Sequence, residues 1–368
     1  MANTLKFGNG EWYGKKDTIL AYNDENYNYK PLPFDFSRDS SATVVNKDGL
    51  IETVGNGEPR IDYKDDSKGA LLLEPQRTNL ITYSEDFSNW SSGSTYTTQG
   101  YAISPDGTQN ASRLLFTGSG QNIYINTSAT GDVVGSIYVK GTLGETIQLF
   151  VGGGETQFTL SGDWQRIVVE KTSSTNGFIN VNTNGGSTAR DLLVWGAQLE
   201  EGSYPTSYIP TQGSSVTRLA ESSTNCGAGT NIFSNTSAVW FIDFSRFVYD
   251  SSINTKSAAL ENSSGSEQIR FHFDYPSKTV RFRDAKNGFA NIGGNIVTET
   301  NIRKKVALKI DGTTLRVFAD GSQIGSDYTR PTGFDIDKMS LYSSGTNVFD
   351  IKFYNTSLTD AELQALTT

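Results

Sequence analysis

The sequence has very little cysteine and histidine. Among 368 residues there is one Cys, Cys226, and one His, His272. A single Cys excludes an intrachain disulfide, and one Cys with one His cannot form a zinc site. Charged residues are also scarce, at 19% against roughly 25% in typical soluble domains. We therefore expect packed sheets or subunit contacts to provide the stability.

Basic residues are outnumbered, and long apolar runs are missing. The net charge is −9, so a nucleic-acid backbone would be repelled and we expect no nucleic-acid partner. No apolar run approaches the ~20 residues of a membrane helix, which predicts no membrane insertion. The start, MANTLKFGNGEWYGKK, lacks the apolar core of a secretory signal. We therefore expect the protein to be soluble and made in a cytoplasm.

What the sequence does contain is typical of β-structure. It has 37 Gly and an aromatic share of 11%, together with many Ser, Thr and Asn residues. Aromatic residues favour strands, and Gly, Asn and Ser favour the turns between them. The composition predicts an all-β protein. The pattern along the chain predicts an extended N-terminal arm followed by two β-sandwich (jelly-roll) domains.

The order of segments suggests four regions. Residues 1–82 are rich in Tyr, Asn, Asp and Gly and are expected to be an arm with one hairpin, SATVVNKDGLIETV. Residues 83–211 hold seven short alternating runs without intervening helices, as in a jelly roll. Residues 212–230 are rich in Ser, Thr and Gly and are expected to be a linker. Strand-like runs resume over 231–368.

The C-terminal region shows clear local signals. In IRFHFDY, Phe271, Phe273 and Tyr275 alternate with Arg270, His272 and Asp274, which predicts a strand with one apolar face. The chain ends in SLTDAELQAL, where Thr359 and Glu362 have the spacing of a capping box. A short terminal helix is therefore expected.

Known catalytic motifs are missing from the sequence. A Ser/His/Asp triad would require His272, which lies within an expected strand and is interpreted as a surface histidine, and no nucleophile-elbow motif is present. The glycines of VGGGETQ lack the Lys-Ser/Thr of a phosphate loop. We predict no catalytic and no metal-binding residues.

A glycosidase is the serious alternative, because β-sandwiches include such enzymes. Retaining cleavage requires two carboxylates about 5 Å apart. No expected strand carries two acids at such spacing, and the adjacent Glu200 and Glu201 point to opposite faces of a strand. Carboxylates contributed by separate strands stay open, so the prediction is a non-enzyme with a glycan-active enzyme as alternative.

Glycan binding requires less, namely an aromatic platform with nearby amides and a carboxylate. Trp90, Tyr96 and Tyr101 fall in expected loops at the start of the jelly roll and are the glycan-binding candidates. Trp164 and Trp195 fall in strand-like runs and are expected in the core. No cofactor is expected, and calcium held by acids such as Asp106 would be structural.

One segment resembles a known family. LLLEPQRTNLITYSEDFSNW (71–90) resembles a signature of bacteriophage tail-fibre, head-fibre and other appendage proteins. The segment before it, FSRDSSATVVNKDGLIETVGNGEPRIDY (36–63), resembles the segment that usually precedes this signature in those proteins. DLLVWGAQLEEGSYPTSYIPTQGSSVTR (191–218) is similar to the close of a carbohydrate-binding-module-like jelly roll. KKVALKIDGTTLRVFADGSQI, with the ending FDIKFYNTSLTDAEL, is similar to concanavalin or laminin-G sandwiches.

The resemblance implies a structural subunit of a virion, made in the host bacterial cytoplasm. Its N-terminal region would attach to capsid or tail proteins, the chain would form a homotrimer, and its sandwiches would bind cell-surface or mucus glycans. Head fibre and short tail fibre remain open, and a secreted non-viral lectin is a further alternative. In the signature, Pro75 is expected to end a strand, and Arg77 and Asn79 to satisfy backbone groups at a junction.

Overall fold

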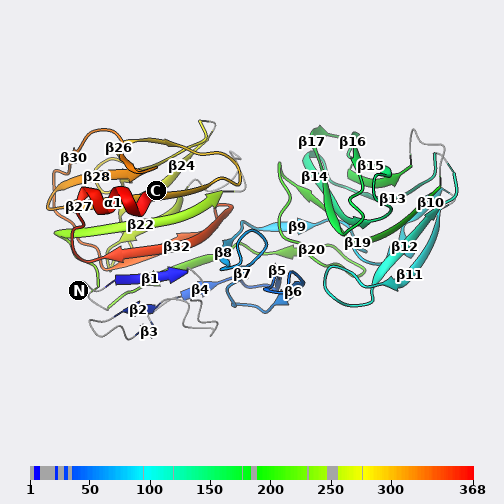
Figure 1. Ribbon diagram of the computed structural model, residues 1–368, viewed down its shortest axis with the longest axis horizontal. Coiled ribbons are helices and arrows are strands. Elements are labelled where there is room, and N and C mark those ends of the chain that lie inside the picture. Colours follow the sequence, from blue (N-terminus) through cyan, green and yellow to red (C-terminus); the bar gives the residue numbers. More distant parts are fainter. Residues whose placement is uncertain are drawn as a thin grey trace. The chain divides into compact units, whose positions relative to one another are not determined.

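The chain is all-β apart from one α-helix and one short 3-10 helix among the described residues. The computed structural model describes residues 4–8, 21–23, 29–31, 35–93, 95–118, 120–175, 177–183, 189–229, 232–246, 256–275 and 277–368. These residues form two compact units (Figure 1). Unit 1 comprises 1–39, 55–75 and 220–368, and unit 2 comprises 40–54 and 76–219. The chain therefore passes between the units four times.

Unit 1 is a sandwich of two antiparallel sheets. The first follows the order β29 (Ser322–Gln323), β28 (Thr314–Ala319), β27 (Arg303–Asp311), β22 (Ser237–Arg246), β32 (Thr346–Tyr354), β1 (Thr4–Gly8), β2 (Ala21–Asn23) and β3 (Tyr29–Pro31). It also includes β30 (Tyr328–Thr329) on β28, β8 (Ala70–Leu73) on β32, and β7 (Ile61–Asp62) on β8. The second follows β26 (Ala290–Val297), β25 (Thr279–Asp284), β24 (Glu267–Asp274), β23 (Lys256–Glu261), β31 (Lys338–Tyr342), β21 (Ser222–Cys226) and β4 (Asp35–Ser37).

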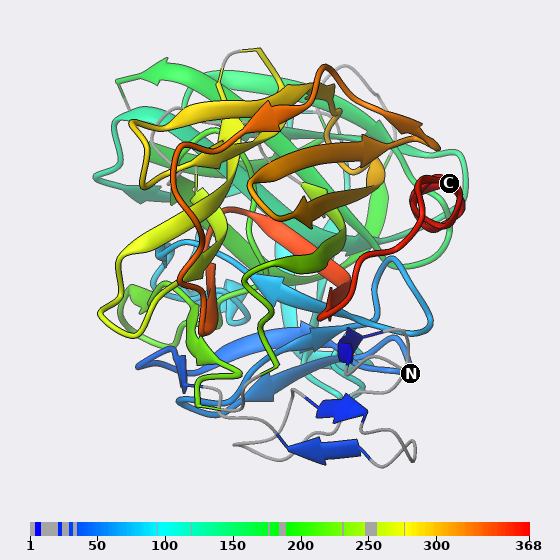
Figure 2. The same ribbon diagram turned by 90° about the vertical axis from the view of Figure 1, so that its left-hand side faces the viewer.

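Aromatic side chains fill the space between these two sheets. Phe271 and Phe273 of β24 are buried and contact Phe244 of β22 edge to face, as the alternation in IRFHFDY predicts. Helix α1 (Asp360–Thr367), the red helix beside the C-terminus in Figure 2, begins at the predicted capping box. Its Leu363 packs against the opposite face of the first sheet. No described helix is long and apolar enough to cross a membrane.

Unit 2 is a second sandwich with its own core. One sheet follows β10 (Ser91–Gly93), β13 (Asn122–Thr127), β18 (Gly177–Asn182), β15 (Thr146–Val151) and β16 (Gly154–Thr159). The other follows β11 (Tyr96–Ala102), β12 (Ala111–Phe116), β19 (Arg190–Glu201), β14 (Gly131–Lys140) and β17 (Gln165–Ser174). All seven strands expected in this region are present, and β10, β11 and β16 are additional.

The expected hairpin is present and covers part of unit 2. Strands β5 (Ala42–Val45) and β6 (Ile51–Val54) pair around the Asp48-Gly49 turn. Ile51 packs with Trp195 and Tyr208 on the outer side of the β19 sheet. Trp195 is buried, as expected, and Trp164 is half-buried beside the same cluster.

The domain boundaries differ from those expected from the sequence. Residues 35–82 of the expected arm form β4 to β9 and are divided between the two units. The expected linker, 212–230, contains β20 (Val216–Arg218), which pairs with β9 (Arg77–Asn79), and β21, which pairs with β31 and β4. The reason is that Arg218 and Glu221, two charged residues in a Ser/Thr-rich stretch, are fully buried and held by partners. Most of residues 1–34 lie outside the described residues.

A buried ionic cluster joins the three chain segments of unit 1. The Glu221 carboxylate accepts hydrogen bonds from Arg38 Nη1 (2.8 Å), Arg60 Nε (2.7 Å), Arg60 Nη2 (2.6 Å) and the Glu74 backbone N–H (2.9 Å). Arg60 Nη2 also donates to Glu74 Oε2 at 2.8 Å. Burial acts to lower the pKa of Arg60, but the charges of Glu221 and Glu74 outweigh it and raise the pKa. The two arginines and two glutamates balance in charge, so no member of the cluster is an unpaired buried charge.

In unit 2, Asn79 of the signature joins chain segments through buried hydrogen bonds, as Glu221 does in unit 1. Its Nδ2 donates to the carbonyls of Ala197 (3.1 Å) and Ile209 (2.8 Å), and its Oδ1 accepts from the N–H groups of Ile81 and Leu199, both at 3.1 Å. The side chain is fully buried, and these four bonds satisfy the amide completely. The signature therefore ends β8 before Pro75 and then attaches the chain to unit 2, which supports its interpretation as a structural junction.

Replacing Glu221 should strongly destabilise the protein. In Glu221→Gln, two buried arginines lose their shared anion, so we expect a loss of roughly 3–5 kcal/mol in the free energy of unfolding. Urea unfolding measures this loss. Glu201→Gln, at an exposed position, is the matched control and should change stability little. A loss for Glu221→Gln no larger than that of the control would contradict the role of the cluster.

Replacing Asn79 tests the signature itself. Asn79→Ala leaves two buried carbonyls and two buried N–H groups without their partner, so we expect a loss of roughly 2–4 kcal/mol. Thr78→Ala is the control, because Thr78 makes one exposed hydroxyl contact, to Thr217. Thermal unfolding followed by circular dichroism compares the two variants. Equal melting temperatures would contradict the stabilising role of Asn79.

Candidate functional site

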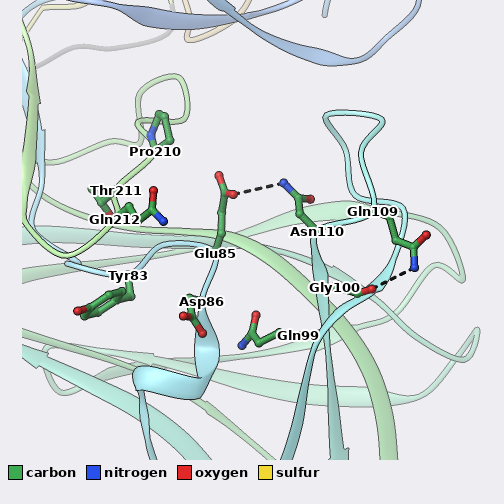
Figure 3. Close-up of a pocket in the computed structure, with 10 residues that line it drawn as sticks. All are labelled: Tyr83, Glu85, Asp86, Gln99, Gly100, Gln109, Asn110, Pro210, Thr211 and Gln212. Carbon is green, nitrogen blue, oxygen red and sulfur yellow. Dashed lines mark hydrogen bonds between the residues drawn. The ribbon is translucent and has the colours of Figure 1, made fainter.

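Unit 2 contains an open pocket of about 570 Å³ (Figure 3). Three segments contribute to its wall: the chain just before the 3-10 helix η1 (Phe87–Asn89), the β11–β12 hairpin, and the chain that follows β19. The lining residues are Tyr83, Glu85, Asp86, Gln99, Gly100, Gln109, Asn110, Pro210, Thr211 and Gln212. Most of these side chains carry an amide, a carboxylate or a hydroxyl.

Reciprocal hydrogen bonds fix two of these segments against each other. The Ser84 N–H donates to Thr211 Oγ1 (3.0 Å), and the Thr211 N–H donates to Ser84 Oγ (2.8 Å). Tyr83 and Gln212 form a β-bridge directly beside them. The pocket wall is therefore ordered by internal bonds, while the Gln212 side chain stays exposed.

The β11–β12 hairpin is shaped by an irregularity in its strand pairing. The register shifts between Thr98 and Ala102, and Gly100 has a φ of +59°, a backbone conformation that favours glycine. The Gly100 carbonyl accepts from Gln109 Nε2 at 3.2 Å, as Figure 3 shows. The bulge thus places Gln99 and Gln109 at the pocket.

Glu85 lies at the centre of the pocket view in Figure 3. Its Oε1 accepts from the Tyr208 hydroxyl (2.8 Å), and its Oε2 accepts from Asn110 Nδ2 (3.3 Å). Burial raises the pKa of Glu85, and the charge of Asp106 adds to that increase, against the lowering effect of the Tyr208 hydrogen bond. Burial likewise raises the pKa of Tyr208, so its hydroxyl remains a donor.

The two aspartates near Glu85 are occupied by local hydrogen bonds. Asp106 accepts from the Ser104 hydroxyl (2.6 Å), from the Thr108 N–H and hydroxyl (both 2.7 Å), and from Asn110 Nδ2 (3.0 Å). Burial alone would raise the pKa of Asp106, but these bonds outweigh it and lower the pKa. Asp86 caps η1 by accepting from the Ser88 N–H at 3.1 Å. Both aspartates therefore act mainly as turn and cap residues.

The structure does not gather the three aromatic residues predicted from the sequence. Trp90 is only 5% exposed, packs against Phe87, and donates its Nε1–H to the Tyr83 carbonyl at 2.9 Å. It belongs to the core of unit 2, so its prediction as a surface platform is wrong. A large apolar ring next to Phe87 is more stable inside the sandwich than in water.

Tyr96 and Tyr101 are exposed on the edge strand β11, at 67% and 50%. The Tyr101 ring lies 5.1 Å from the Arg113 guanidinium, which holds Asp191 through two bonds of 2.8 and 2.6 Å. Neither tyrosine lines the pocket, although Tyr101 directly follows Gly100. The role of Tyr96 and Tyr101 as glycan-stacking residues stays a prediction.

Sequence reasoning missed the pocket residues themselves. Glu85 and Asp86 were within the signature, but nothing in the sequence distinguished them from solvated acids. Gln99, Gln109 and Gln212 carry no motif, because their proximity arises from the pairing of distant segments. Among the described residues, no group of three His, Cys, Asp or Glu side chains could hold a metal ion.

No protein-family model and no curated protein matches this sequence. Solved structures with similarity include the CBM40 of Ruminococcus gnavus IT-sialidase bound to α2,3-sialyllactose, at 17% identity over 39% of this chain and 94% of its own, with a TM-score of 0.30. Domain 4 of AbnA, a GH43 arabinanase of Geobacillus stearothermophilus in complex with arabinotriose, is 11% identical over 46% of this chain and 83% of its own (TM-score 0.31).

Trypanosoma rangeli sialidase in complex with sialic acid is 11% identical over 95% of this chain and 65% of its own (TM-score 0.33). These neighbours are carbohydrate-binding modules and glycosidases. At such identities and TM-scores they assign neither a family nor a function to this chain.

Proposed function

We propose that this chain is a structural subunit of a phage virion appendage, a head fibre or short tail fibre, and that it binds glycans at the pocket beside Glu85. The observation that carries the glycan-binding proposal is the chemistry of that pocket. Gln109 and Gln212 present exposed amides, which both donate and accept, beside a carboxylate and the Tyr83 ring. Sugar hydroxyls need such paired donors and acceptors, and their C–H faces need a ring.

The appendage proposal rests on the signature at 71–90 and its neighbouring segments. The N-terminal region would attach the subunit to capsid or tail proteins, and three copies would assemble, as the resemblance implies. Residues 35–82 take part in both folded units, and the described strands before them pair into the first sheet of unit 1, so the attaching region would be part of a folded unit. Three identical pockets would raise the apparent affinity for a surface that carries many glycans.

Binding without cleavage fits the acids of this pocket better than hydrolysis does. Glu85, with its raised pKa, would suit a general acid. Hydrolysis also needs a second free carboxylate, as nucleophile or as base for a water. Asp86 accepts a hydrogen bond within η1 and Asp106 accepts hydrogen bonds within its own turn. Neither carboxylate is therefore free to act as nucleophile or base. We therefore propose a non-enzyme, with a glycosidase as the alternative.

A glycan array with the full chain, followed by calorimetry on the best ligand, tests the proposed function. We expect millimolar to micromolar affinity per site. The double variant Gln109→Ala/Gln212→Ala removes two exposed amides and should weaken binding about tenfold or more, since each lost hydrogen bond is worth about 1 kcal/mol. Gln157→Ala, an exposed glutamine on β16 of the same unit, should bind like the unchanged protein.

Product analysis of the same mixtures separates binding from cleavage. We expect no release of reducing ends. Release that disappears in Glu85→Gln would establish the glycosidase alternative, and binding by none of the arrayed glycans would contradict the proposed function.

A further inference from the structure

The outer face of the seven-stranded sheet in unit 1 carries rows of basic side chains. On β24 and β25, the alternate residues Ile269, Phe271, Phe273, Val280 and Phe282 point into the core. The residues between them therefore lie on the outer face. In register, Arg281 is opposite His272 and His272 is opposite Lys256, while Arg283 is opposite Arg270.

Like charges placed directly opposite each other destabilise a sheet. Basic residues are concentrated on this face although acids outnumber bases in the whole chain, 40 to 31. Among the described residues, Asp274 pairs with Arg281, with Arg283 (3.1 Å) and with His272 (3.2 Å). Glu267 pairs with Lys256 and with Arg270 (2.7 Å). Two carboxylates are thus shared among four permanent cations and a histidine.

His272 reports the positive potential of this face. It is only 7% exposed, unlike the surface histidine expected from the sequence. Burial, with Arg283 and Arg270, lowers its pKa to about 4 and outweighs the opposing charge of Asp274. Arg281 and Arg283 remain partly exposed, with 15% and 24% of their side chains accessible. The face therefore presents guanidinium groups to an anion.

An aromatic ring borders the basic rows. Phe289 is 46% exposed in the turn between β25 and β26, and the Arg270 guanidinium lies 4.7 Å from the centre of its ring. Its φ of +57° is rarely adopted by an aromatic residue. Asn291, which is exposed, is opposite Arg283 on the neighbouring strand. A ring, an amide and arginines side by side suit a sugar that carries a charge.

We propose that this face binds the anionic group of an acidic saccharide, with Arg281 and Arg283 contacting a carboxylate or phosphate and Phe289 packing against the sugar ring. A nucleic acid is a poor fit, because the chain as a whole carries a net charge of −9. The site lies within unit 1 and does not depend on the glycan pocket of unit 2.

Calorimetry with three probes tests this proposal on the full chain. The probes are trigalacturonate, which carries carboxylates, glucose 6-phosphate, which carries a phosphate, and neutral maltotriose. We expect at least one charged probe to bind, more weakly as salt is added. Binding of trigalacturonate alone would identify uronic acids as the source of the anion, and binding of glucose 6-phosphate alone would identify phosphorylated sugars.

Variants locate the binding. Arg281→Gln/Arg283→Gln should weaken it at least tenfold, and Phe289→Ala severalfold. Arg316→Gln is the matched control, because Arg316 pairs with Asp327 on another part of unit 1. If the double variant does not fold, Arg283→Gln alone takes its place. Gln109→Ala/Gln212→Ala should leave this binding unchanged, which separates it from the pocket of unit 2.

Three outcomes would overturn the proposal: neither charged probe binds, Arg316→Gln weakens binding as much as the Arg281/Arg283 change, or maltotriose binds here with equal affinity.

Discussion

The buried carboxylate of Glu221 is the constraint on which unit 1 depends. Arg38 follows β4, Arg60 precedes β7, Glu74 follows β8 and Glu221 precedes β21, so the cluster joins ends of strands from both sheets. Charges removed from water are stable only when every partner is in place. The segments 35–39, 55–75 and 220–226, although far apart in sequence, must therefore all be in place for the cluster to form. This explains why a segment that looks like an arm is part of a folded unit.

Unit 2 is organised by neutral hydrogen bonds, and its pocket follows from them. Asn79 joins the signature to β19 and to the chain beyond it, while Ser84 and Thr211 hold the same two segments one step further along. These bonds hold the frame of the pocket, and Gln109 and Gln212 are exposed on it. Polar groups that are exposed and held on an ordered frame bind a ligand with little loss of conformational entropy.

The sequence predicted local features well and long-range ones poorly. The strands, the Asp48-Gly49 turn and the Thr359 capping box depend on neighbouring residues, so their patterns can be read directly. The role of Glu221 could not be read, because its partners lie 147 to 183 residues away. Trp90 was misplaced for the same reason: its burial depends on how η1 packs onto the sandwich. The pocket combines three segments that are distant in sequence, so no single stretch of sequence predicts it.

The central functional claim is that this chain is displayed on a virion. It is tested most directly by electron microscopy of purified phage particles that encode the chain, labelled with an antibody raised against the folded protein. The account predicts discrete label at fixed points of the capsid or tail, with the bound antibody displaced by an excess of free protein. Purified particles that lack the chain, and carry no label at any point, would contradict it.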